Sequence, residues 1–205
     1  MAAQKTYDAI PRDDEEAGRL GSEIPPRPDL YALMDELIAD HHEDLESCRI
    51  ALIWRYGWTA DDDGRLKLGQ FQKASSLEVQ LHGYDAKILL NFEAWEAADF
   101  TEEQRRALLD HELCHGALKL DAEGDPAVDP NTGRLKYRVR KHDHEEFACI
   151  VERHGLWTRN AEAFALAAMR GARKHGQMGL FEDDAPPPLK RKADKPRPSG
   201  AEWPS

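Results

Sequence analysis

The sequence lacks a long apolar run, a signal-like start and a disulfide framework. None of its hydrophobic stretches is long enough to cross a bilayer, and residues 1–27 have no apolar core of the kind that a secretion signal carries. The three cysteines, Cys48, Cys114 and Cys149, are odd in number and contain no Cys-x-x-Cys pair. We therefore expect a cytoplasmic protein with reduced thiols and no membrane contact.

Positive charge is scarce relative to negative charge. The 205-residue chain has 28 Lys and Arg against 39 Asp and Glu, which gives a formal net charge of −11. This balance argues against a protein that coats nucleic acid non-specifically. It leaves direct nucleic-acid binding undecided, because a local basic patch can still contact phosphates.

The composition divides the chain into three parts. Residues 1–28 are charged and end in a proline-rich stretch, so we expect a flexible N-terminal arm. Residues 29–174 carry the hydrophobic periodicity of one folded domain. Residues 175–205, with three consecutive prolines and a basic end, are expected to form a disordered tail.

Hydrophobic spacing within the domain predicts an α+β fold, with a small, mainly antiparallel sheet packed on helices. A strand over residues 88–92 is expected at a sheet edge, where an extended substrate could pair with it. Thr101 and Gln104 form a capping-box pattern that starts a helix continuing to Leu120. The other expected elements are helices over 29–47, 142–154 and 160–174 and strands over 48–58, 66–71 and 135–140.

Residues 111–115 (HELCH) form the pattern H-E-x-x-H within this helix. Positions four apart share a helix face, so His111 and His115 can direct both imidazoles at one point. Neutral imidazoles suit Zn²⁺, and the carboxylate of Glu112 suits the base that deprotonates a water on the metal. The alternative is a chance coincidence without a metal, but the helix is apolar on more than one face, and histidines there need an explanation. The pattern predicts a zinc-dependent peptidase site.

A catalytic zinc usually takes three protein ligands, and the candidates for the third lie in residues 142–147 (HDHEEF). We rank His142 first, Glu145 or Glu146 second and His144 third. The competing interpretation is that acidic residues decorate a helix N-terminus, where each stabilises by roughly 0.3–1 kcal/mol. That interpretation does not explain the histidines at positions 142 and 144.

Two other potential donors near the motif are expected to be structural. His42 is expected on a charged helix face. Cys114 should point at least about 60° away from the histidine face, so we interpret it as a small core residue.

Three segments together resemble the phage metallopeptidase family: residues 109–115 (LDHELCH), 137–147 (YRVRKHDHEEF) and 151–155 (VERHG). The similarity extends over residues 28–170. It implies a minimal zincin-type domain, similar in layout to the SprT-like proteases, encoded by a phage, a prophage or a host bacterium. In SprT-like domains the third ligand is a histidine followed shortly by an aromatic residue. His142 with Phe147 resembles that arrangement at a different spacing.

Residues 177–181 (QMGLF) resemble the Q-x-x-L-F peptide with which bacterial DNA-processing proteins dock on the replication sliding clamp. Gln177, Leu180 and Phe181 would make that contact and place the protein at DNA. The alternatives are a chance match, or packing of the two apolar side chains on the domain.

The leading hypothesis is therefore a zinc peptidase that acts on protein or peptide substrates, with Tyr137, Arg138 or His144 as the oxyanion donor. One alternative is a non-catalytic zinc-binding interaction module. Another is a regulator that cleaves a single repressor. The presence of Glu112 favours an enzyme, because a purely structural zinc site has no use for that carboxylate.

Overall fold

A computed structural model describes residues 6–130, 132–142, 151, 155–156 and 158–177. The chain forms two compact units, residues 1–142 and residues 143–205. The elements of the first unit are β1 (Tyr7–Ala9), α1 (Asp14–Leu20), α2 (Pro28–His41), the 3₁₀ helix η1 (Glu43–Leu45), β2 (Ile50–Arg55), β3 (Gly69–Lys73), α3 (Ser76–His82), β4 (Ala86–Asn91), α4 (Phe92–Trp95), α5 (Glu102–Cys114), β5 (Gly116–Leu118) and β6 (Tyr137–Val139). The second unit contains α7 (Arg159–Lys174).

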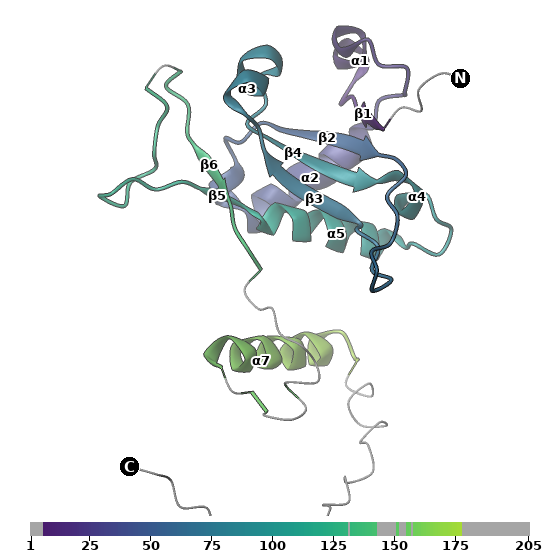
Figure 1. Cartoon of the computed structure of the whole chain (residues 1–205), viewed down its shortest axis with the longest axis vertical. Coiled ribbons are helices and arrows are strands. Elements are labelled where there is room, and N and C mark those ends of the chain that lie inside the picture. Colours follow the sequence, from purple (N-terminus) through teal and green to yellow (C-terminus); the bar gives the residue numbers. More distant parts are fainter. Residues whose placement is uncertain (1–5, 131, 143–150, 152–154, 157, 178–205) are drawn as a thin grey trace, which may run out of the picture. The chain divides into compact units, whose positions relative to one another are not determined.

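The fold is α+β, and its main sheet has the strand order β1-β2-β4-β3 (Figure 1). The central pair β2–β4 is parallel, while β1–β2 and β3–β4 are antiparallel, so the sheet is mixed. β4 hydrogen-bonds to a strand on each side. The prediction that residues 88–92 lie at a sheet edge is therefore wrong, and the strands at the edges are β1 and β3. The run of apolar residues in β4 reflects burial within the sheet, as is usual for a strand with a parallel neighbour.

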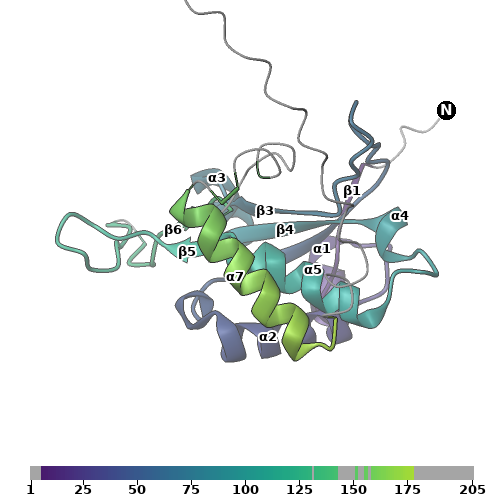
Figure 2. The same cartoon turned by 90° about the horizontal axis from the view of Figure 1, so that it is seen from below.

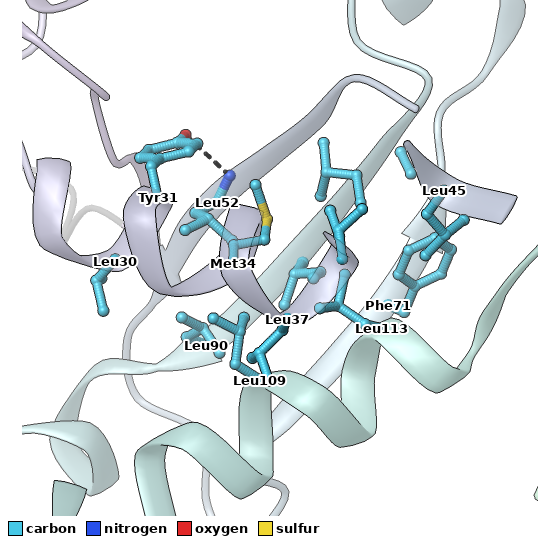
Figure 3. Close-up of a cluster of buried hydrophobic side chains, with 14 of the residues drawn as sticks. Leu30, Tyr31, Met34, Leu37, Leu45, Leu52, Phe71, Leu90, Leu109 and Leu113 are labelled. Atoms are coloured by element: carbon cyan, nitrogen blue, oxygen red, sulfur yellow. Dashed lines mark hydrogen bonds between the residues drawn. The ribbon is translucent and has the colours of Figure 1, made fainter. Parts of the chain in front are cut away.

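The helices α2 and α5 pack together on one face of this sheet (Figures 1 and 2). Leu109 and Leu113, one turn apart on α5, are fully buried and meet side chains from α2 and the sheet (Figure 3). Burial of each such side chain is worth about 1.5–3 kcal/mol. The Tyr31 hydroxyl of α2 donates to the Ile10 carbonyl and accepts from the Leu52 amide at 3.2 Å, which ties the helix to β2. These contacts hold α5 at a fixed position against the sheet.

The described part of the N-terminal segment, which the sequence predicts to be a flexible arm, forms a strand and a helix, β1 and α1. β1 pairs with β2 over Tyr7–Ala9, and Ile10 belongs to the buried core. Asp13 caps α1 by accepting from the Glu16 amide, and Gly21 ends that helix with a left-handed φ of 61°. The structure differs from a flexible arm here because β1 completes the hydrogen bonding of β2, a long-range pairing that the composition of residues 1–28 does not reveal.

The start of α5 agrees with the sequence prediction, but its end does not. Thr101 and Gln104 form the reciprocal capping box. The helix ends at Cys114 with His115 as its C-cap, so Ala117 does not lie on it and Leu120 is 53% exposed beyond it. The physical reason is that the chain after His115 pairs as β5 with β6. A Cβ on Gly116 would lie 2.9 Å from a Leu45 methyl, so a larger residue here would have to displace a buried side chain where the chain turns away from α5.

The remaining expected elements agree in broad position. β5 and β6 form an antiparallel ladder whose connecting loop extends away from the sheet (Figures 1 and 2). In the second unit, α7 is capped by Thr158 and not by Asn160. Most of the helix expected over residues 142–154 and most of the tail, including Leu180 and Phe181, lie outside the described residues. Among the described helices, none combines the length and apolar character that a bilayer-spanning segment needs.

Candidate metal centre

Three histidines converge at the end of α5. His111 lies in its last turn, His115 is its C-cap, and His142 lies three residues beyond β6. Each offers one ring nitrogen, and these atoms all lie within 4.8 Å of one another. The ring centroids are separated by 5.1 Å for His111–His115, 5.1 Å for His111–His142 and 4.6 Å for His115–His142. The structure thus brings together the three residues that the sequence analysis selected as first-choice ligands.

The backbone next to His142 fixes the orientation of His115. The Nδ1 of His115 lies 2.8 Å from the Arg140 carbonyl oxygen, and the Arg140 amide donates to the His115 carbonyl at 2.7 Å. A carbonyl can only accept, so Nδ1 carries the proton and Nε2 keeps its lone pair. A metal-binding imidazole commonly has its other nitrogen held in this way. His115 is therefore oriented to coordinate through Nε2.

The spacing of one pair of ring nitrogens is close to the separation of two ligands across a zinc ion. The Nε2 atoms of His142 and His111 are 3.2 Å apart. Zinc–nitrogen bonds of about 2.0–2.1 Å at a tetrahedral angle place two nitrogens about 3.3–3.4 Å apart. Burial lowers the pKa of His111, and the neighbouring His115 and His142 lower it further. This favours the neutral ring, which is the form that binds a metal.

Glu112 lies buried beside the histidines. Glu112 is only 4% exposed, and its carboxyl group interacts electrostatically with the neighbouring His115 and His142. Burial raises the pKa of this group, against the opposing effect of a hydrogen bond from the Phe71 backbone N–H of β3. Oε2 has no hydrogen-bond partner among the described residues. A buried carboxylate oxygen without a partner is costly, so it indicates a group poised for an interaction that the protein itself does not make.

Gly69, the first residue of β3, leaves the space that Glu112 occupies. A Cβ at this position would lie 2.5 Å from Glu112 Oε1 and 2.9 Å from its Cδ. No real Cβ contact is that short, so any other residue at position 69 must displace the carboxylate. The backbone of β3 therefore fixes the Glu112 carboxylate in two ways. The Phe71 N–H donates a hydrogen bond to it, and Gly69 leaves room for it.

We expect Gly69→Ala to lower the peptidase activity that the sequence predicts by up to roughly 10²-fold, because a displacement of about 1 Å at a reacting group can cost that much. Metal content and thermal unfolding should stay close to those of the wild type, since the clash is with the end of one side chain. Gly18→Ala is the matched control, because a Cβ there meets nothing within 4 Å. Full activity of Gly69→Ala would show that the position of Glu112 does not depend on this glycine.

Other predicted site residues are placed differently. Tyr137 is 3% exposed and belongs to the hydrophobic core, and it lines a cavity together with Asp85 and Arg134. Arg138 is exposed on β6. The competing ligands His144, Glu145 and Glu146 lie outside the described residues, so their ranking below His142 stays a prediction.

The structure also corrects the placement of two residues near the motif. His42 is buried, with its Nε2 2.7 Å from Asp110 Oδ1, and does not lie on a charged surface. Cys114 is exposed and is not a core residue. Sequence reasoning also missed Gly69, Phe71 and the Arg140 carbonyl. They act through the backbone, so their residue types gave no signal.

Comparison with known proteins identifies a family. A family model with the description "Putative phage metallopeptidase" matches residues 23–165, well over half of the chain. No curated protein and no solved structure shows a significant match.

Proposed function

Because the chain belongs to the Putative phage metallopeptidase family, we propose that it is a zinc-dependent peptidase of the H-E-x-x-H type. In this proposal His111, His115 and His142 hold the metal and Glu112 is the general base. The observation that carries it is the convergence of three imidazoles beside a buried carboxylate whose Oε2 has no partner within the described part of the chain.

The donor set supports zinc as the metal. Three neutral imidazoles suit zinc, whereas Mg²⁺ and Ca²⁺ prefer oxygen ligands. Three protein ligands in a tetrahedral site leave one position for water or substrate, as in catalytic and not structural zinc sites. When bound, zinc would supply a Lewis acid that lowers the pKa of a coordinated water to about 7.

Glu112 is suited to moving a proton in this site. Burial raises the pKa of its carboxyl group, which makes the carboxylate a stronger base for the proton of an attacking water. The Phe71 N–H holds the carboxylate, and Gly69 gives it room. Glu112 would accept the proton of the attacking water and later deliver a proton to the amine of the broken peptide bond.

The accessible strand beside the site is β3. β4 cannot add a substrate strand because it is already paired on both sides, whereas β3 lies at an edge of the sheet. Gly69 at its start adjoins Glu112. We propose that an extended peptide lies along this end of β3, where backbone hydrogen bonds would give binding with little sequence selectivity. This arrangement would be similar to the zincin layout expected from the SprT-like resemblance.

Metal removal tests the proposal. We expect the purified protein to contain zinc at His111, His115 and His142, to lose its digestion of casein on chelation, and to regain it with added Zn²⁺ but not with Mg²⁺. Casein digestion unchanged in zinc-depleted protein would contradict the proposal. Zinc binding without any peptidase activity on casein or on cell extract would favour a non-catalytic zinc module, and cleavage of one cellular protein alone would favour a dedicated regulator.

A further inference from the structure

We propose that His42, Asp110 and Cys114 form a second metal site, selective for Zn²⁺ or a similar borderline-soft divalent ion, that clamps the end of α2 to α5. Their ligand atoms, one ring nitrogen, one carboxylate oxygen and one sulfur, all lie within 4.8 Å of one another. This inference does not depend on the proposed peptidase activity.

The second site uses the same helical spacing as the first. Asp110 and Cys114 are four residues apart on α5, so their side chains lie one above the other. Each precedes one of the histidines His111 and His115 by one position. A step of one residue rotates the side chain by about 100°, so the two pairs lie on different faces of the helix and form separate sites.

His42 is the donor that the fold holds in place. It is 8% exposed and forms the C-cap of α2, where its amide donates to the Ile38 carbonyl at 2.9 Å. Its own carbonyl accepts from the Leu45 amide at 2.8 Å. A buried histidine fixed by its backbone at both sides, with Nε2 directed at a carboxylate 2.7 Å away, loses little conformational freedom on binding an ion.

The geometry needs only small side-chain adjustments to bind an ion. Bonds of about 2.0–2.3 Å to nitrogen, oxygen and sulfur at tetrahedral angles separate the ligand atoms by about 3.3–3.6 Å. The Nε2–Oδ1 hydrogen bond of 2.7 Å must therefore open slightly, and all three ligand atoms already lie within 4.8 Å of one another. Asp110 has 39% of its side chain exposed and Cys114 is exposed, so both can rotate without disturbing the core.

The charges around the site tolerate a cation. Arg106, one turn before Asp110 on α5, is a nearby positive charge that would oppose one. Its guanidinium pairs with Glu36 at 2.9 Å, and Asp40 also acts on it. The local balance of Glu36, Asp40 and Asp110 against Arg106 is therefore negative. A mixed nitrogen, oxygen and sulfur donor set selects zinc over calcium or magnesium.

Occupancy would add a metal link between two helices that already meet through core side chains and the Arg106–Glu36 ion pair. The α2 end carries His42, and α5 carries both the other donors and the first centre. Because a folded-state ligand stabilises the folded protein by mass action, metal at this site should raise the unfolding temperature of the whole first unit.

Cobalt substitution distinguishes the two sites, because only the second contains a thiolate. We expect the full-length wild type to bind two equivalents of Co²⁺ and to show a thiolate-to-cobalt charge-transfer band. Cys114→Ser should lose that band and one equivalent of metal. Cys48→Ala and Cys149→Ser should keep both, which controls for the other thiols. Absence of the band in the wild type, or a band that survives in Cys114→Ser, would overturn the proposal.

A second pair of variants separates this result from the first centre. His111→Ala/His115→Ala should lose one equivalent of cobalt yet keep the charge-transfer band and the rise in unfolding temperature with Zn²⁺. Adding His42→Gln to this double variant should remove both the charge-transfer band and the rise in unfolding temperature with Zn²⁺. Circular dichroism checks that each variant is folded. Loss of the band in His111→Ala/His115→Ala with retained fold would mean that Cys114 belongs to the first centre, and the second site would not exist.

Discussion

Glu112→Gln should lower kcat/KM for peptide hydrolysis by roughly 10²–10⁴-fold, the range typical for loss of a general base. The amide has the same shape as the carboxylate and can still accept from the Phe71 N–H, but it cannot take a proton from water. Zinc content should equal that of the wild type, because Glu112 is not among the three converging donors. The measurement is steady-state kinetics beside metal analysis of the same preparation.

The control for this variant is Glu103→Gln, an exposed glutamate in the first turn of the same helix. It should keep wild-type kinetics, since its carboxylate faces solvent far along α5 from the histidines. Equal activity of Glu112→Gln and wild type would remove Glu112 from the mechanism. A variant that loses zinc as well as activity would instead give this residue a role in metal binding.

His142→Ala should abolish peptidase activity and weaken zinc binding by more than roughly 10²-fold. Loss of a residue that only hydrogen-bonds to a metal ligand already costs about 10–100-fold in metal affinity. His142 is proposed to be a direct ligand, so its loss should cost more. Its Nε2 lies 3.2 Å from that of His111, so its removal leaves a site with two protein nitrogens. Competition with a zinc-binding dye measures the affinity, and thermal unfolding without metal shows whether the fold persists.

His82→Ala is the matched control, because His82 is an exposed histidine in the last turn of α3. It should bind zinc like the wild type. If His142→Ala keeps both zinc and activity, the third ligand must come from elsewhere, and Glu145, Glu146 and His144 become the residues to replace next.

The parts of the site that could be predicted are those that local spacing encodes. The capping box at Thr101 fixes where α5 begins, and the four-residue spacing of His111 and His115 follows from helix geometry alone. The end of α5 could not be predicted from local spacing. Ala117 and Leu120 continue the helical periodicity, but β5–β6 pairing prevails over it after Gly116.

Tertiary pairing also explains the other differences. The apolar run of β4 indicates burial, but only its pairing with β2 and β3 shows that it has a strand on each side. β1 is three residues long, too short for a periodic signal. His42 looks like a surface residue in a polar stretch until the contact with Asp110, 68 residues away, is known. Each of these features depends on residues distant in the sequence.

The hydrogen bonds between His115 and Arg140 extend the β5–β6 ladder by one residue pair towards the metal centre. The position of His142 relative to His115 therefore depends on the register of the β5–β6 ladder and not on the number of residues between the two histidines. Lengthening or shortening the excursion from residue 119 to residue 136 would leave the ladder, and with it the imidazole of His142, in register. Proteins built on this plan can thus differ widely in that interval while presenting the same three nitrogens to an ion.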